Sequence, residues 1–273
     1  MDLSQKLLLK HGKESTKSTF RLRDWDPDMD FGKSKKDVET ELPGILRNLS
    51  ELQYRLYAEN SRSLLIILQG MDTSGKDGTV RNVVGALNPQ SCYVKSFKVP
   101  SEEEHSHDYL WRVHKSIPPK GHIAIFNRSH YEDVIGVRVD GFISKSDISL
   151  RYRQINDFER YLFENQVTIL KFFLHISRDE QKKRLRDRLK DSTKHWKISE
   201  SDFVNHRNWD SYMEAYEDTL RLCNTEWAQW YIIPANAKHF RNLAVSQIVS
   251  RKLEDMKPEF PDPKLDIHNF VFD

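Results

Sequence analysis

Five short apolar runs alternate along the chain with longer segments in which apolar residues recur at helical spacing. The runs are SLLIILQ at 63–69, SCYVKSFKV at 91–99, HIAIF at 122–126, VTILKFFLHIS at 167–177 and WYIIP at 230–234. Short apolar runs separated by helical segments of ten or more residues predict strands of a buried parallel sheet. The expected fold is therefore α/β, with a parallel sheet covered by helices on both faces.

The helical segments are expected at about 34–59, 76–87, 101–117, 146–166, 177–190, 203–223 and from 235 to about 256. Pro43 could break the first of these helices near its start. Ser101 with Glu104, and Ser177 with Glu180, have the spacing of a capping box, in which each pair satisfies the backbone at a helix start. Trp209, Tyr212 and Tyr216 fall on one helix face, which could lie in the core or at a subunit interface; the core is favoured.

Composition narrows the class of protein. The chain has 273 residues, 38% hydrophobic and 31% charged, with a net charge of +2 and two cysteines. A net charge this small gives no reason to expect nucleic acid as a partner. No run approaches the ~18 apolar residues that a membrane span requires, so no membrane partner is expected. Cys92 and Cys223 lack metal-ligand spacing and are expected to be free core thiols, and a cytoplasmic location is expected.

The segment that follows the first strand has the pattern of a phosphate-binding loop. Gly70, four residues, Gly75 and Lys76 give G-x-x-x-x-G-K between a buried strand and a helix, where backbone N–H groups and the lysine can hold phosphate oxygens. The alternative is a tight strand-to-helix turn with a surface lysine and no role in phosphate binding. Asp77 stands where a Mg²⁺-binding Ser or Thr is usual, and Asp72 adds an acid inside the loop. Metal binding is therefore expected to move to carboxylates.

Two further segments carry charged residues that suit phosphoryl transfer. Asn127 to Asp133, in FNRSHYEDV, follow a buried strand whose carboxyl end faces the ligand side of such a sheet. Arg128 could bind phosphate, while Glu132 and Asp133 could hold Mg²⁺. Residues 179–197 are strongly basic and lie where nucleoside monophosphate kinases have a lid. Either segment could instead be a solvated surface, and most of the basic side chains in the second are expected to be solvated.

Several motifs in order resemble the polyphosphate kinase 2 family. They are GMDTSGKDGT, VKSFKVPSEEEHSHDYLWRVHK, FNRSHYEDV, FFLHISRDEQKKRL, KHWKISESD and WAQWYIIPAN, and the resemblance extends over about residues 20–255. The resemblance implies a P-loop kinase fold and Mg²⁺-dependent transfer of phosphoryl groups between inorganic polyphosphate and nucleotides, with Mn²⁺ as a substitute ion. The NRSHYEDV form resembles class III, which implies AMP and ADP as acceptors, and GMP or GDP besides.

The resemblance also implies roles for individual residues. Asp72, Lys76, Arg128 and Asp133 would be catalytic, and Asp72 and Asp133 would hold the metal. The residues expected to bind phosphate or nucleotide are Gly70, Thr73, Ser74, Gly75, Lys76, Asp77, Gly78, Lys98, Arg112, Asn127, Arg128 and Glu132. The lid cations expected to face the donor are Lys182, Lys183, Arg186 and Lys190. Residues 1–273 would form one P-loop kinase domain, with an arm over 1–36, a lid over about 179–200 and a tail over about 257–273.

Three alternatives remain open on the sequence. An ATP-dependent nucleoside monophosphate kinase would share the loop, although Asp77 and the long basic lid argue against it. A non-catalytic module that binds polyphosphate or nucleotide would not need the metal-holding acids. A phosphohistidine mechanism would need a suitably placed histidine, and His130 is the one inside a motif. The sequence does not decide the oligomeric state, and a homo-oligomer is one outcome.

Overall fold

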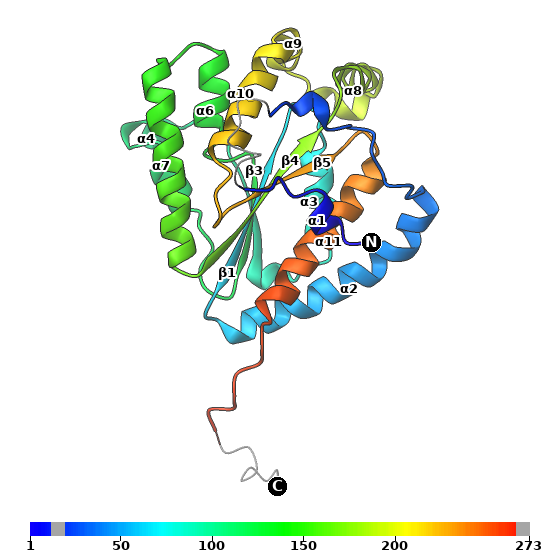
Figure 1. Cartoon of the computed structure of the whole chain (residues 1–273), viewed down its shortest axis with the longest axis vertical. Helices are drawn as coiled ribbons and strands as arrows, with labels where there is room; N and C mark the ends of the chain where they lie inside the picture. The colour runs from blue at the N-terminus through cyan, green and yellow to red at the C-terminus, as the bar shows by residue number, and fades with distance from the viewer. Residues whose placement is uncertain (12–19, 266–273) are drawn as a thin grey trace.

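The computed structural model describes residues 1–11 and 20–265 and is built around a five-stranded sheet in the order β2-β3-β1-β4-β5 (Figure 1). The strands are β1 (Ser63–Gln69), β2 (Cys92–Ser96), β3 (Ile123–Asn127), β4 (Val167–His175) and β5 (Trp230–Pro234). Every neighbouring pair is parallel. The predicted α/β fold with a parallel sheet is therefore confirmed.

The register of the central strands sets the position of the phosphate-binding loop. β1 lies between β3 and β4, with Leu68 opposite both Asn127 and Phe172. The segments that follow β1 and β3 consequently leave the sheet side by side, at the edge formed by the carboxyl ends of the strands. Ligands of open α/β sheets bind at this edge.

Helices cover both faces of the sheet. In Figure 1, α2, α3 and α11 lie on one side, whereas α6, α7 and α10 lie on the other. The longer helices are α2 (Lys35–Glu59), α3 (Lys76–Val84), α6 (Glu132–Val139), α7 (Lys145–Glu164), α8 (Arg178–Lys190), α9 (Glu200–Arg207), α10 (Trp209–Leu222) and α11 (Lys238–Met256). Short helices are α1 (Leu3–Lys6), α4 (Glu102–Ser106), α5 (Trp111–His114) and the 3-10 turns η1 (Leu22–Asp24), η2 (Pro89–Ser91) and η3 (Ser192–Lys197).

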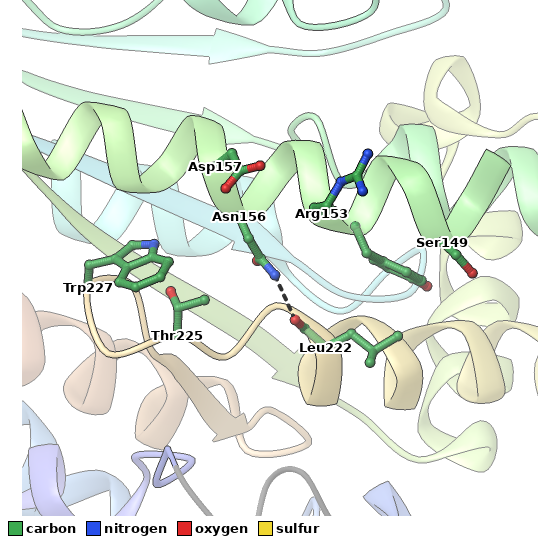
Figure 2. A pocket seen from close by; sticks show the side chains of 8 residues that line it. Ser149, Arg153, Asn156, Asp157, Leu222, Thr225 and Trp227 are labelled. Carbon is green, nitrogen blue, oxygen red and sulfur yellow. Dashed lines mark hydrogen bonds between the residues drawn. The ribbon is translucent and has the colours of Figure 1, made fainter. Parts of the chain in front are cut away.

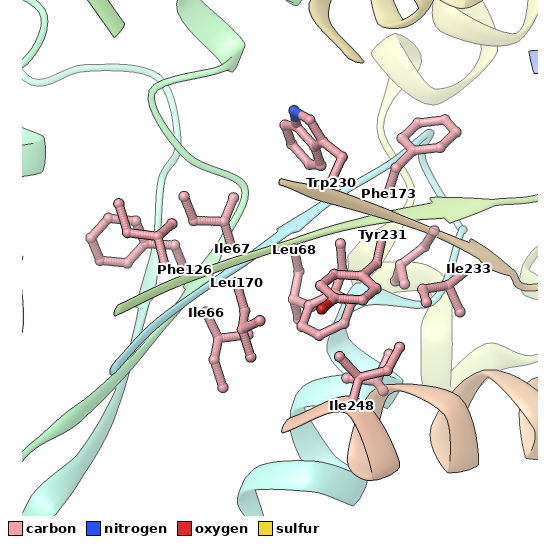
Figure 3. Packing of buried hydrophobic residues seen from close by; sticks show 14 of the residues in the cluster. Ile66, Ile67, Leu68, Phe126, Leu170, Phe173, Trp230, Tyr231, Ile233 and Ile248 are labelled. Atoms are coloured by element: carbon pink, nitrogen blue, oxygen red, sulfur yellow. The ribbon is translucent and has the colours of Figure 1, made fainter. Parts of the chain in front are cut away.

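The core is formed by the sheet and by the apolar stripes of these helices. Ile66, Phe126 and Leu170 come from three adjacent strands and are at most 2% exposed. In Figure 3, Ile248 of α11 lies on the same side of the sheet as Ile66 and Leu170. Trp209, Tyr212 and Tyr216 of α10 are also buried, as favoured from the sequence. Both cysteines are free and buried, as expected.

Three helix predictions need correction, and one helix was missed. Pro43 is the ninth residue of α2 and lies inside the helix without ending it, although its ring removes one backbone donor. The helix expected over 101–117 divides into α4 and α5, because His107 is extended. The helix expected over about 203–223 begins earlier, at Glu200, and divides at Asn208 into α9 and α10. The helix α6 was not predicted at all.

The two capping-box predictions have different outcomes. Both halves are present at α4, where Ser101 and Glu104 exchange hydrogen bonds. At α8, Ser177 Oγ accepts from the backbone N–H of Glu180, but the Glu180 carboxylate pairs with Arg184. An ion pair with a buried guanidinium has taken the place of the reciprocal cap.

The N-terminal residues contact the outer strand of the sheet. Leu8 forms an antiparallel bridge with Tyr231 of β5, and Leu3, Leu7 and Leu22 are buried. Residues 12–19 of the expected arm and 266–273 of the expected tail lie outside the described residues. Across 1–11 and 20–265, no helix combines the length and the apolar character needed to cross a membrane.

Candidate phosphoryl-transfer site

The loop between β1 and α3 curls back on itself around the amino group of Lys76. Gly70, Thr73 and Gly75 have φ of 145°, 64° and 104°, and this turning aims backbone groups inward. The Nζ of Lys76 donates to the carbonyl oxygens of Gly70, at 2.7 Å, and Met71, at 3.1 Å. The glycine spacing thus places the lysine beneath the loop and at the N-terminus of α3.

Lys76 is 9% exposed, and this burial lowers the pKa of its ammonium group. Burial and then the neighbouring charge of Arg128 lower the pKa of the Lys76 ammonium to about 8, because both disfavour its charged form. Asp72 and Glu132 act in the opposite direction. A negatively charged ligand at the loop would favour the charged form of the lysine.

Asp72 joins the loop to two distant parts of the chain. Its Oδ1 accepts from Arg128 at 2.5 Å, and its Oδ2 accepts from Asn205 of α9 at 2.8 Å. Burial acts to raise the pKa of the Asp72 carboxyl, but Arg128 and Lys76 outweigh it and keep the pKa below its usual range. The loop acid is therefore held in its charged form between an arginine and an amide.

Arg128 occupies a strained backbone position at the end of β3. Its φ is 63°, and its guanidinium bridges Glu132, at 3.1 Å, and Asp72. Glu132 first, and Asp72 after the opposing effect of burial, raise the pKa of Arg128. Left-handed backbone at a non-glycine residue is a feature of functional sites. The arginine joins the loop to the first turn of α6.

Asp77, the residue in place of the usual Ser or Thr, has two partners. Its Oδ1 accepts from Asn127 at 2.9 Å, and its Oδ2 accepts from Lys197 of η3 at 2.8 Å. The hydrogen bond from Lys197, opposed by burial and supported by Asn127, lowers the pKa of Asp77. The acid thus links the start of α3, the end of β3 and the basic segment.

Asp133 belongs to a different group of charges from Asp72. Arg112 lies 3.5 Å and Arg151 3.9 Å from its carboxylate, and Arg112 also donates to the carbonyl oxygen of Lys98 at 2.8 Å. Burial raises the pKa of Asp133 despite these two cations. The structure therefore brings Asp133, Arg112 and Lys98 together, as a neighbour of the loop cluster and not as part of it.

The basic segment meets the loop through residues other than the four expected. Lys182, Lys183, Arg186 and Lys190 of α8 are exposed, and within 1–11 and 20–265 none of them bonds to the loop. Arg184 is 8% exposed and donates to the carbonyl oxygens of Thr73 at 2.9 Å and Ser74 at 3.2 Å. One face of α8 is thus fixed to the loop, while the opposite face carries exposed basic side chains, of which Lys183 lies 3.5 Å from the carboxylate of Glu180.

Comparison with known proteins identifies the family. A family model described as Polyphosphate kinase 2 matches residues 32–261. The chain belongs to the Polyphosphate kinase 2 family. A family member from Meiothermus ruber, named AMP/ADP-polyphosphate phosphotransferase, is 47% identical over 247 residues, covering 90% of this chain and 92% of that protein.

Other family members differ in name and in length. An ADP-polyphosphate phosphotransferase of Rhodopseudomonas palustris is 41% identical over 251 residues, or 87% of each chain. A polyphosphate:AMP phosphotransferase of Pseudomonas syringae pv. tomato is 36% identical, and the match covers 83% of this chain but 45% of that protein. The crystal structure of Polyphosphate Kinase 2 from Arthrobacter aurescens TC1 superposes with a TM-score of 0.92 at 40% identity, covering 98% and 94% of the two chains.

Three residues of the site escaped prediction from the sequence. Asn205, Arg184 and Lys197 contact Asp72, the loop carbonyls and Asp77, respectively. Arg184 and Lys197 stand within the basic segment, but their spacing did not distinguish them from the solvated cations. Asn205 carries no charge and belongs to no motif, so only the fold could reveal its place.

The donor chemistry of the site suits a divalent cation. Asp72, Glu132 and Asp133 offer carboxylate oxygens, the ligands that Mg²⁺ prefers. The Oδ2 of Asp133 is buried without a hydrogen bond among the described residues, as are the hydroxyls of Thr73 and Ser74. In that part of the chain, no three His, Cys, Asp or Glu side chains form a ready metal cluster. Phosphate oxygens of a substrate would therefore have to complete the coordination.

A separate pocket of about 370 Å³ lies away from the loop, between α7 and the segment that precedes β5 (Figure 2). Tyr152 and Asn156 line it from α7, and Thr225 and Trp227 from the facing segment. It shares no residue with the loop or with FNRSHYEDV. The site is accordingly placed by the charged groups at the sheet edge and not by this hollow.

Proposed function

We propose that this protein transfers the terminal phosphoryl group of inorganic polyphosphate to AMP and ADP, with GMP and GDP as further acceptors. The observation that carries the proposal is the contact between Asp72 and Arg128, which unites an acidic phosphate-binding loop with the cationic start of FNRSHYEDV. The names of the Meiothermus and Pseudomonas family members, which pair polyphosphate with AMP or ADP, support the same reaction.

The proposed roles follow from where charge develops. Phosphoryl transfer passes through a loose transition state, so that positioning and charge neutralisation supply most of the rate. The acceptor would attack the terminal phosphoryl group in line, and the rest of the polyphosphate would leave. Lys76 and Arg128 would neutralise the negative charge on the group that is transferred. Gly70, Gly75 and Gly78 would let backbone N–H groups approach the donor, with Thr73 and Ser74 offering hydroxyls. Direct transfer needs no phosphohistidine, and His130 is 0% exposed.

The acceptor and the lid have their own proposed residues. Arg112 and Lys98, beside Asp133, would bind the nucleotide, and Asn127 and Glu132 would hold the neighbouring charges in place. The exposed cations of α8 would track the polyphosphate chain beyond the loop, since a row of exposed cations suits a long anion. Residues 1–273 would act as one domain, with 179–200 as its lid.

Asp72 and Asp133 would hold the divalent cation, which we propose to be Mg²⁺ with Mn²⁺ as a substitute, and Glu132 could assist. When bound, the ion would neutralise charge on donor and acceptor phosphates. The lowered pKa of Asp72, held down by Arg128 and Lys76 against the effect of burial, keeps this carboxylate ready for a cation. Asp133 would have to exchange part of its interaction with Arg112 and Arg151 for the ion.

The test is an acceptor panel with polyphosphate as the only donor. Purified protein with Mg²⁺ is given AMP, ADP, GMP or GDP and polyphosphate without ATP, and nucleotide products are separated and quantified. ADP from AMP and ATP from ADP are expected. Phosphorylation of AMP by ATP but not by polyphosphate would overturn the proposal in favour of a nucleoside monophosphate kinase. Polyphosphate binding without any turnover would overturn it in favour of a binding module.

A further inference from the structure

Arg241 of α11 lies directly behind the phosphate-binding loop. It is 3% exposed, and its guanidinium donates to Asn242 Oδ1 at 2.8 and 3.2 Å and to the carbonyl oxygen of Ser74 at 3.5 Å. The residue is 167 positions from Ser74 in the sequence. It is close to the loop only because α11 packs against α3 on the same face of the sheet.

The guanidinium occupies the space that side chains at two loop glycines would need. A Cβ at Gly75 would stand 1.8 Å from Nη1 of Arg241, and a Cβ at Gly78 would stand 2.9 Å from Nη2. These two glycines bracket Lys76 at the start of α3. The cation therefore abuts the helix N-terminus, whose backbone N–H groups and dipole attract phosphate.

No carboxylate among the described residues pairs with Arg241, unlike Arg184 and Arg188 nearby, which pair with Glu180 and Asp202. Burial and the like charge of Arg184 lower the pKa of Arg241 to about 10, so it still carries its charge at neutral pH. An unpaired charge in the interior disfavours the folded state unless a ligand of opposite sign compensates it.

We infer that Arg241 is a positioning residue for the phosphoryl donor: a buried, unpaired cation behind Gly75 and Gly78 that strengthens polyphosphate binding through its field, without touching the substrate. This inference rests on the proposed function and names a further determinant of the same site. In a low-dielectric surrounding, a charge several ångströms from an anion still contributes substantially, because little water intervenes. The guanidinium also fixes the carbonyl of Ser74 and thereby the turn of the loop.

The test compares Arg241→Met, which removes the charge at similar length, with Arg241→Lys, which keeps it. Arg251→Met is the matched control, because Arg251 lies on the same helix but is 54% exposed and pairs with Glu254. Affinity for inorganic tripolyphosphate and for long-chain polyphosphate is measured by calorimetry. The thermal unfolding midpoint is measured with and without tripolyphosphate, and kcat and KM for polyphosphate are determined for each variant.

Arg241→Met is expected to bind tripolyphosphate about ten- to a hundredfold more weakly, to raise KM more than it lowers kcat, and to unfold in the absence of ligand no earlier than the wild type. Its stabilisation by ligand should shrink accordingly. Arg241→Lys should recover most of the affinity, and Arg251→Met should match the wild type.

Two outcomes would overturn the inference. Arg241→Met could bind tripolyphosphate as tightly as the wild type and unfold earlier, which would make Arg241 a packing residue. Equal loss of affinity in Arg241→Lys and Arg241→Met, with both folded, would show that shape and not charge matters. A wild type that binds no polyphosphate would instead defeat the proposed function itself, so the two failures are distinguishable.

Discussion

Asp72 is the residue on which the proposed chemistry depends most. Asp72→Asn keeps the size of the side chain and its amide oxygen can still accept from Arg128, but the negative charge is lost. Turnover with polyphosphate is expected to fall about 100-fold or more, since removal of one group aimed at developing charge has effects of this size. Circular dichroism and thermal unfolding should show an intact fold. The control is Asp187→Asn, at an exposed acid of α8; near-normal turnover in Asp72→Asn would contradict the role.

Lys76 should give donor binding a dependence on pH. Its pKa in the free protein is lowered to about 8 by burial and by Arg128, so the lysine is charged below that pH and loses its charge above it. An anion binds the charged form, and affinity for tripolyphosphate should therefore be level below about pH 7 and weaken as the pH rises through 8. Lys76→Arg, which stays charged, should lack this step in calorimetric titrations. A wild type with constant affinity up to pH 9 would contradict the assignment.

The sequence could predict which residues carry charge at the site but not how they pair. The spacing of Gly70, Gly75 and Lys76 identifies them as a phosphate-binding loop, because phosphate binding requires that spacing. The partner of Asp72 on α9 could not be foreseen, since Asn205 is 133 positions away and its side chain has no distinctive chemistry. No partner for Asp77 is evident from the sequence. In the fold, β3 and η3 place Asn127 and Lys197 within hydrogen-bonding distance of its carboxylate.

Among the elements, the ion pair between Lys197 and Asp77 joins the C-terminal end of the basic segment to the start of α3. Asp77→Asn removes the pairing with Lys197 of η3 but retains an oxygen for Asn127. Because the Asp77 side chain is 63% exposed, the free energy of unfolding should change by less than about 1 kcal/mol. Amide hydrogen exchange over 192–197 should nevertheless become several-fold faster. Asp187→Asn serves as the comparison, and unchanged exchange in Asp77→Asn would show that η3 is held by other contacts.

Helix boundaries were the part of the architecture that sequence patterns described least well. Residues 101–108 contain no apolar side chain, so the helix expected there is indicated by its capping box alone. The apolar spacing over 203–223 continues across Asn208, although the backbone departs from the helix there. Periodicity records which face is buried, and two short helices can share one buried face. The departure at Asn208 has a consequence for the site, because it lets α9 turn Asn205 toward Asp72 while α10 packs into the core.

For the molecule as a whole, a buried ion pair links the sheet to the helices on one face. Lys171 of β4 donates to Glu159 of α7 at 2.7 Å and to the hydroxyl of Tyr131 at 2.9 Å, and all three side chains are 0% exposed. Lys171→Met removes the lysine charge beside the buried Glu159 carboxylate and leaves it with the Tyr131 hydroxyl and His130, so the free energy of unfolding should fall by about 3–5 kcal/mol. Urea denaturation measures this change.

The matched variant is Lys171→Met combined with Glu159→Leu, in which neither charge remains. Replacement of a buried pair by apolar side chains is often close to neutral, so the double variant should recover most of the lost stability. A double variant as unstable as Lys171→Met alone would mean that the hydrogen bonds of Lys171 to Tyr131 and to the carbonyl oxygen of Cys223, and not the charges, hold this region together.

The short antiparallel contact between the N-terminal residues and β5 bears on how copies of this protein behave toward one another. Leu9 donates its backbone N–H to Trp230 and Ile232 donates to Leu7, at 2.8 and 2.9 Å. Outer strands with free backbone groups are templates for edge-to-edge aggregation. Residues 7–9 occupy those groups on β5 and so block the pairing of this edge strand with another copy of the chain. Substitutions at residues 7–9 should therefore lower the solubility at high protein concentration and leave the phosphate-binding loop, at the carboxyl ends of the strands, unchanged.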